Sequence, residues 1–259
     1  MNMASDTVVV TLSDDAHLER AMRTIRDIRG PGRYWGPLVY IAIDFEPPRN
    51  FCALYDVEVW RRVRIDTSVL DAQIREYPFT GGDGRERTNT VQWSKIHTFD
   101  PEFASRWRRV VFLDAGLRVL RPFTPVLEHA WEGSIVALDD SHPEDTKRFG
   151  CQLERNAAYS QLGALAHGAG HVKGDLSDER YFLNCFWIYD MRLNDDLTWG
   201  GPRHALIELM ERYPVFLTNE MGAMNVYFHM LRLVWRPLRA GHRAARCTGS
   251  ATAPDSRSA

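Results

Sequence analysis

Two apolar segments with one amphipathic segment between them open the chain, and they restrict the folds it can adopt. Residues Thr7 to Leu12 are dense in β-branched side chains, which predicts a buried strand. Leu18 to Ile28 carries apolar residues at helical spacing and ends at a Gly-Pro-Gly stop. Leu38 to Ile43 is a second apolar run of strand length. This β-α-β order favours an α/β fold with a mixed, mostly parallel sheet flanked by helices.

The bulk composition is that of one globular domain. The chain has 259 residues, of which 44% are hydrophobic and 25% charged, so it can bury a substantial core. Its formal net charge of −2 gives no electrostatic reason to expect a nucleic acid or an anionic membrane as partner. From residue 236 the composition shifts to Arg, Ala, Gly, Ser and Thr without apolar periodicity. We therefore predict one domain over residues 1–235 and a flexible tail over residues 236–259.

Cysteine usage and hydropathy bear on the compartment. The four cysteines are far apart and form no Cys-x-x-Cys pair, which favours free thiols over zinc or a disulfide framework. No signal-peptide pattern and no apolar stretch long enough to span a bilayer stand out. These features predict a cytoplasmic protein without a membrane span.

The remaining segments alternate between strand and helix signals. A polar region from Ser141 to Asp178 is expected to consist mainly of long loops with one or two helical turns, and Gly81 to Gly84 reads as a flexible loop. The other expected elements are strands at Val57–Val63, Arg109–Asp114, Ser134–Leu138 and Tyr181–Tyr189, and helices at Val91–Phe99, Pro202–Tyr213 and Asn219–Leu231.

The segment from Arg109 to Phe123 carries the clearest chemical signal. Its apolar run ends in Asp114 and is followed by Gly116. In open α/β sheets, ligands bind at the carboxyl ends of the strands. Asp114 either caps the following turn or faces such a ligand, and the residues alone leave both readings open.

Other polar residues interrupt or end apolar strands in the same way. Asn184 stands in an apolar run, where a buried amide must find a hydrogen-bond partner, either a backbone group or a polar ligand. Asp139 and Asp140 follow another strand, and the repeated position suggests one shared crevice. Lys95, on an expected helix, is either solvated or aimed at a phosphate.

These segments, in this order, resemble the GT-A-fold glycosyltransferases of family eight, of the glycogenin and galactinol synthase type. Arg109 to Phe123 is similar to the family's strand ending in Asp-x-Asp, and Trp93 to Phe99 to its Ser-Lys-Leu stretch. Tyr181 to Cys185 resembles the Phe-Asn-Ser-Gly strand, and Asn219 to Asn225 the Asp-Gln-Asp segment. The resemblance implies transfer of a sugar from a nucleotide-diphosphate donor, a uridine one by expectation, to an unknown acceptor.

The resemblance also implies roles for individual residues. Donor binding falls to positions after the first strand and around the Asp-x-Asp segment, and sugar orientation to the later motifs. The donor-binding set is Thr11, Asp14, Asp15, Lys95, Asp114 and Gly116, and the catalytic set is Asn184, Glu220 and Asp139.

The sequence departs from the family pattern in three places, and two of them concern the metal. Gly116 replaces the second aspartate of Asp-x-Asp, and Phe186 replaces the glycine after Asn184-Cys185. The closing segment that supplies a histidine to the metal is not present, although His242 lies in that region. Asp114 alone is expected to hold Mn²⁺ or Mg²⁺ only weakly, with water and diphosphate as its other ligands. The alternative is a catalytically inactive relative that binds a nucleotide, a sugar or a protein partner without transfer.

Overall fold

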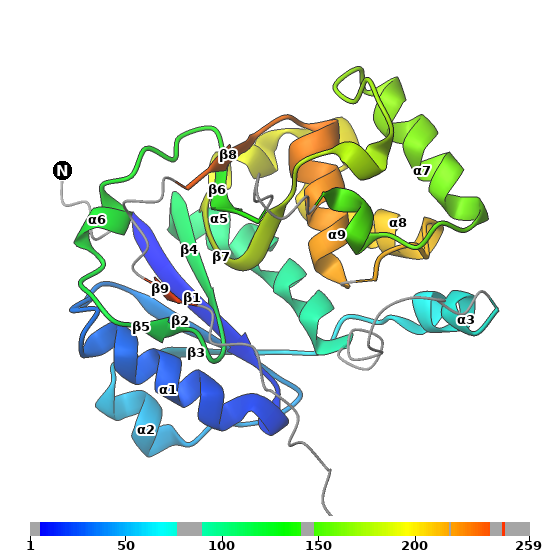
Figure 1. The fold of residues 1–259 in the computed structure, drawn as a ribbon. Helices are drawn as coiled ribbons and strands as arrows, with labels where there is room; N and C mark the ends of the chain where they lie inside the picture. Colours follow the sequence, from blue (N-terminus) through cyan, green and yellow to red (C-terminus); the bar gives the residue numbers. More distant parts are fainter. Residues whose placement is uncertain (1–5, 77–89, 141–147, 218, 239–244, 247–259) are drawn as a thin grey trace, which may run out of the picture.

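The computed structural model describes residues 6–76, 90–140, 148–217, 219–238 and 245–246. They form a seven-stranded sheet with helices on both faces, together with a separate two-stranded pair (Figure 1). The strands are β1 (Thr7–Ser13), β2 (Leu38–Ile43), β3 (Glu58–Arg62), β4 (Arg109–Asp114), β5 (Arg118–Val119), β6 (Ile135–Asp139), β7 (Phe182–Asp190), β8 (Trp235–Pro237) and β9 (Ala245–Arg246).

The helices range from single 3₁₀ turns to helices of three turns. The α-helices are α1 (Leu18–Arg29), α2 (Arg49–Leu54), α3 (Ser68–Glu76), α5 (Pro101–Arg106), α6 (Thr124–Leu127), α7 (Ala157–Gly168), α8 (Pro202–Arg212) and α9 (Glu220–Met224). The 3₁₀ helices are η1 (Asp15–His17), η2 (Thr90–Phe99), η3 (Phe149–Gln152), η4 (Leu176–Asp178), η5 (Met191–Asp195) and η6 (Leu197–Trp199), and η7 (Asn225–Leu231) is a π-helix.

The order of the large sheet is β3-β2-β1-β4-β7-β6-β8. Strands β1 to β4 run parallel, β7 is antiparallel to both of its neighbours, and β8 is parallel to β6. The fold class predicted from the sequence, an α/β domain with a mixed, mostly parallel sheet between helices, is therefore confirmed.

Alternation along the strands divides the core into two layers. In β1, Val8, Val10 and Leu12 pack into the cluster that also holds residues of α8, α9 and η7. Val9 packs on the other face, against Ala21 and Ile25 of α1. Because successive side chains of a strand point to opposite faces, a strand covered on both sides must be apolar at nearly every position. This explains why the predicted strands read as continuous apolar runs.

The topology creates one switch point. The chain runs from β1 outward through β2 to β3, then returns to place β4 on the opposite side of β1. The carboxyl ends of β1 and β4 are neighbours there, since Leu12 pairs with Asp114. In open α/β sheets the crevice at such a reversal is the usual ligand site.

The region between Ser141 and Asp178 differs from the expected loops. Residues 141–147 lie outside the described part, but Ala157–Gly168 forms the three-turn helix α7. Its sequence is rich in Ala and Gly, and only Leu162 and Ala166 are buried, so it lacks the apolar stripe that identifies a helix.

Smaller differences concern helix type and boundaries. The helix predicted near Val91 is a 3₁₀ helix, and the one predicted from Asn219 changes from α to π at Asn225. Strand β8 crosses the predicted domain boundary at residue 235, while most of the predicted tail and the glycine-rich loop at Gly81–Gly84 lie outside the described residues. Within the described ranges, every helix is too short or too polar to cross a bilayer.

Candidate functional site

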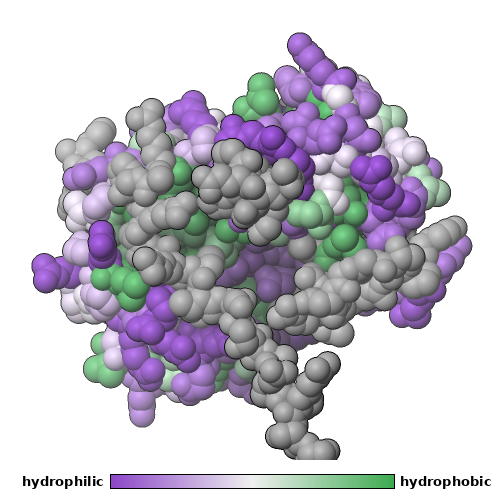
Figure 2. All heavy atoms as spheres, in the orientation of Figure 1, coloured by the Kyte–Doolittle hydropathy of each residue, from purple (hydrophilic) through white to green (hydrophobic). Residues whose placement is uncertain are grey.

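Four polar side chains from four elements meet at the carboxyl end of the sheet. Lys95 of η2 places its Nζ 2.9 Å from Asp114 Oδ1 and 2.8 Å from Glu220 Oε1. Asn184 of β7 donates from Nδ2 to the same Glu220 oxygen at 2.6 Å. In Figure 2 the face drawn is recessed near its centre, where the visible residues are mostly hydrophilic. We call Lys95, Asp114, Asn184 and Glu220 the carboxylate–lysine cluster.

Each member is held by a different local feature. Asp114 ends β4 and is followed by the turn that Leu117 closes by donating to the Asp114 carbonyl at 3.1 Å. Lys95 lies on η2 with its Nζ 5.6 Å from the centre of the Phe112 ring. Glu220 is the first residue of α9, and the positive φ of Asn219, 52°, turns the chain just before it. The cluster therefore depends on segments that are far apart in the sequence.

The cluster is a buried ion pair with an excess carboxylate. The side chains of Lys95 and Glu220 are 3% and 2% exposed, whereas that of Asp114 is 27% exposed. Burial lowers the pKa of Lys95, but the attraction of Asp114 and Glu220 outweighs it, so the net shift is upward. Burial raises the pKa of Asp114 to about 6, against the pull of Lys95. The two carboxylates therefore favour the protonated, charged form of Lys95.

Glu220 has an acceptor oxygen to spare. Its Oε1 takes bonds from Lys95 and Asn184, but its buried Oε2 has no hydrogen-bond partner among the described residues. A buried carboxylate oxygen without a donor is costly, and such atoms in native proteins call for an explanation. A bound molecule with a hydroxyl group would supply the missing donor.

The other sequence-predicted residues have contacts of a different kind. Asp14 caps η1 by accepting from the His17 backbone N–H at 3.1 Å, and Asp15 is exposed in that turn. Thr11 is fully buried, and its Oγ1 has no partner in the described part of the chain. Asp139 forms an ion pair with Arg180, opposite β7. The contacts thus join Lys95, Asp114, Asn184 and Glu220 and do not include Thr11, Asp14, Asp15 or Asp139.

Gly116 has a backbone conformation that limits what can stand there. Its φ is +102°, in the region that L side chains rarely adopt, and its N–H donates to Thr24 Oγ1 at 2.9 Å. A Cβ at this position would lie 3.6 Å from Cδ and 3.7 Å from Cβ of Arg20. Arg20 lies in the first turn of α1 and is not among the residues that the sequence motifs selected.

A divalent cation does not fit the described residues well. Both oxygens of Asp114 are within 3.0 Å of Lys95 Nζ, and Gly116 supplies no second carboxylate. Within the described ranges, no group of three His, Cys, Asp or Glu side chains is placed to hold a metal ion. Mg²⁺ and Mn²⁺ favour several hard oxygen ligands, which the described residues at this end of the sheet do not present.

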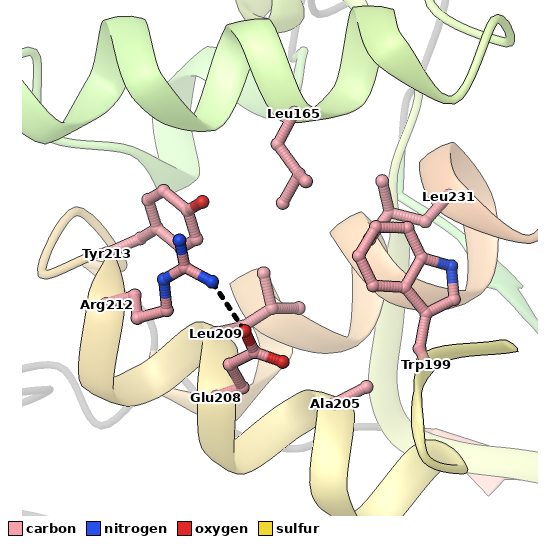
Figure 3. A pocket seen from close by; sticks show the side chains of 8 residues that line it. All are labelled: Leu165, Trp199, Ala205, Glu208, Leu209, Arg212, Tyr213 and Leu231. Carbon is pink, nitrogen blue, oxygen red and sulfur yellow. Dashed lines mark hydrogen bonds and ion pairs between the residues drawn. The ribbon is translucent and has the colours of Figure 1, made fainter. Parts of the chain in front are cut away.

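A separate pocket lies between α7, η6, α8 and η7 (Figure 3). Leu165, Leu209 and Leu231 point into it, the Trp199 ring forms one wall, and the Glu208–Arg212 ion pair lies at its side. Glu208 and Arg212 are 37% and 63% exposed, so this pocket has no buried charge like that of the carboxylate–lysine cluster. Its chemistry suits apolar contact rather than a charged ligand.

The chain is similar to known proteins in structure rather than in sequence. The sequence matches neither a protein-family model nor a curated protein. The structure, in contrast, is similar to solved glycosyltransferases at low sequence identity. The galactosyltransferase LgtC, in complex with donor and acceptor sugar analogs, matches at a TM-score of 0.54 and 13% identity, over 85% of this chain and 70% of that one.

Two further structures give the same result. The mannosyltransferase Ktr4p from S. cerevisiae, in complex with GDP, matches at a TM-score of 0.54 and 11% identity, over 88% of this chain and 67% of that one. The bifunctional glycosyltransferase WbbM matches at 0.55 and 13%, over 90% of this chain and 39% of that one. The chain therefore has the GT-A fold, as its sequence motifs predicted.

Proposed function

We propose that this protein is a glycosyltransferase of the family-eight type, which moves a sugar from a nucleotide-diphosphate donor to an acceptor. The observation that carries the proposal is the carboxylate–lysine cluster at the switch point of a GT-A fold. A buried cation next to a partly exposed carboxylate, with an unpartnered buried acceptor behind them, is a combination that structural needs alone do not explain.

The residues of the cluster divide the work by position. Lys95 holds a positive charge near which the donor diphosphate would lie, and Asp114 is partly exposed beside it. Glu220 offers Oε2 to a hydroxyl of the donor sugar, while Asn184 and Lys95 hold its Oε1 in place. Thr11, Asp14 and Asp15, after β1, are proposed on the nucleoside side, Gly116 beside the diphosphate and Asp139 on the sugar side.

The transfer creates charge that the cluster can stabilise. The acceptor oxygen forms a bond to the anomeric carbon, and the bond from that carbon to the diphosphate oxygen breaks with its electron pair on the diphosphate. The acceptor hydroxyl proton leaves to solvent or to the diphosphate. Because negative charge grows on the leaving group, a buried cation held before the reaction lowers the barrier most effectively.

The choice of nucleotide rests on the resemblance and on the structural neighbours. The family resemblance favours a uridine donor, whereas Ktr4p was crystallised with GDP. The core-mannan synthase A from Aspergillus fumigatus, with a TM-score of 0.51 and 9% identity over 90% of this chain and 72% of that one, was crystallised in a Mn/GDP form. Both nucleotides, and Mn²⁺, therefore belong in the test.

The test is donor hydrolysis and transfer. The protein is incubated with UDP-glucose, UDP-galactose or GDP-mannose, with and without Mn²⁺, in water or with a mixture of sugar and peptide acceptors, and release of UDP or GDP is followed. We expect release with one donor, and a loss of at least about tenfold in Glu220→Gln, which removes the carboxylate charge. Glu208→Gln, in the separate pocket, is the matched control and should keep full activity. Release at the wild-type rate from Glu220→Gln would contradict the role of Glu220.

The alternative function is a non-catalytic relative that binds a nucleotide, a sugar or a protein without transfer. Gly116 in place of the second aspartate is the observation that favours it. Thermal stabilisation by UDP or GDP without release from any donor, under all the conditions above, would support this alternative over the enzyme.

A further inference from the structure

The backbone conformation at position 116 is unfavourable for an aspartate. Gly116 has a φ of +102° because its N–H turns inward to Thr24 Oγ1, at 2.9 Å, on α1. The Thr24 hydroxyl in turn donates to the Leu117 carbonyl at 3.0 Å. An aspartate at 116 would have to adopt a φ that L residues avoid, so the Asp-x-Asp geometry is not available here without rebuilding the turn.

The side chain of Arg20 lies beside Gly116. Its Cβ, Cγ and Cδ are 3.7, 3.9 and 3.6 Å from the point where a Cβ of residue 116 would be. The aliphatic part of the Arg20 side chain therefore lies at the same edge of the sheet as Asp114, which precedes Gly116 by two residues. Arg20 is exposed, and its side chain makes no hydrogen bond or ion pair that involves the described residues.

A diphosphate bound at this edge of the sheet would need more positive charge than Lys95 supplies. Within the cluster, Lys95 balances only one of the two carboxylates, Asp114 and Glu220. A diphosphate that arrives there needs further positive charge, which Mn²⁺ or Mg²⁺ supplies in a metal-dependent site. An arginine offers the same charge in a planar fork that binds two phosphate oxygens at once. Arg20 also stands in the first turn of α1, a helix of 12 residues whose partial positive charge points the same way.

We propose that Arg20 replaces the divalent cation of this site, so that the protein binds the diphosphate of its donor through Arg20 and Lys95 without Mn²⁺ or Mg²⁺. The inference rests on the proposed donor function and specifies how that site holds its ligand. With glycine at position 116, the turn after Asp114 adds no further carboxylate that would repel the diphosphate beside Arg20.

The experiment measures nucleotide binding rather than turnover. The dissociation constants of UDP and GDP for the full chain are determined by isothermal titration calorimetry, once in EDTA and once in excess Mn²⁺. The variants are Arg20→Gln and, as a matched control, Arg23→Gln, which removes the same charge from an exposed arginine of the same helix. Circular dichroism checks that both variants are folded.

We expect one nucleotide to bind in EDTA about as tightly as in Mn²⁺. Arg20→Gln should weaken that binding by at least about tenfold, because it removes a charge-assisted, two-point phosphate contact. Arg23→Gln should change it less than about twofold, and higher salt should weaken wild-type binding more than that of Arg20→Gln.

The outcomes separate the inference from the proposed function. Binding that requires Mn²⁺, or equal affinity of Arg20→Gln and wild type in EDTA, overturns the inference and leaves donor binding intact. Binding of neither nucleotide with or without Mn²⁺ overturns the donor function itself, and the inference with it.

Discussion

Replacement of Lys95 by methionine tests whether the buried carboxylate of Glu220 depends on the lysine for charge balance. The Nζ of Lys95 is 2.9 Å from Asp114 and 2.8 Å from Glu220, and the lysine side chain is only 3% exposed. Methionine fills most of the same volume without the charge. Glu220, 2% exposed, then keeps Asn184 as its partner but has no cation.

The expected cost follows from the burial of Glu220. Removing one partner of a buried ion pair destabilises proteins by about 3–5 kcal/mol, because the other charge is left uncompensated. For a chain of this length, about 1 kcal/mol corresponds to roughly 2 °C in the melting temperature, so Lys95→Met should melt about 6–10 °C below wild type. Lys173→Met is the control, since that lysine is exposed, and it should stay within about 0.5 kcal/mol of wild type.

A second substitution separates lost charge balance from lost packing. Glu220→Gln keeps the shape of the side chain and the bond from Asn184 but has no charge to balance. In the double variant Lys95→Met, Glu220→Gln, we expect a cost at least about 1 kcal/mol smaller than the sum of the two single costs. If packing of the lysine stem were the whole effect, the two single costs would add.

The stability deficit of Lys95→Met should depend on pH with a definite sign. Without Lys95, the carboxyl group of Asp114 loses the cation that favours its ionised form, so the pKa of Asp114 in the folded state rises further above its usual value. The folded state then binds more protons than the unfolded state at neutral pH, and stability increases as the pH falls. Urea denaturation followed by tryptophan fluorescence should show a smaller deficit for Lys95→Met at pH 5 than at pH 7. A deficit below about 1 kcal/mol at pH 7, or one that grows at pH 5, would refute the reasoning.

Three further predictions test the neighbouring features. Gly116→Asp, which gives the chain an Asp-x-Asp sequence, should lower the unfolding free energy by about 1–3 kcal/mol because residue 116 has a positive φ. The variant should also show no Mn²⁺ binding in a paramagnetic resonance titration. Unchanged stability together with tight Mn²⁺ binding would contradict this prediction. Asp114→Asn should remove part of the pH dependence of wild-type stability. Burial raises the pKa of Asp114 to about 6, so the folded state binds one more proton than the unfolded state between about pH 4 and 6. The unfolding free energy of the wild type should therefore fall, relative to that of the variant, as the pH rises through that window. A parallel pH profile of the two proteins would count against it. Arg29→Met should lower the unfolding free energy, measured by urea denaturation, by about 3 kcal/mol or more, because the buried guanidinium donates to four backbone carbonyls that would lose their donors. Arg26→Met, on the exposed side of the same helix, is the control and should have nearly the stability of the wild type.

The strands were predictable because their apolar runs are buried on both faces. The runs at Thr7, Leu38, Arg109 and Tyr181 all became strands of one sheet. Helix α7 was not predicted, since its Ala- and Gly-rich sequence has no apolar stripe to mark it. The short strands β5 and β8 were also missed, because segments of two or three residues carry too little pattern to be recognised.

The candidate site was predictable as a set of residues but not as a set of contacts. Sequence motifs selected Lys95, Asp114, Asn184 and Glu220, and the structure brings these four together. The same motifs also selected Asp139, which pairs with Arg180 instead. They gave no reason to choose Arg20, because its importance comes from a close approach to Gly116 across the fold.

The sequence by itself determined the layers of this protein, since the periods of its apolar residues decide which segments become strands and which faces are buried. It also placed a carboxylate at the end of β4 and a glycine two residues later. Only the tertiary structure decided what these residues do together. The order of the strands sets which ends are neighbours, so it brings Lys95 and Glu220 to Asp114 and Arg20 to Gly116. Contacts between residues so far apart in the chain depend on that order, which local patterns do not encode.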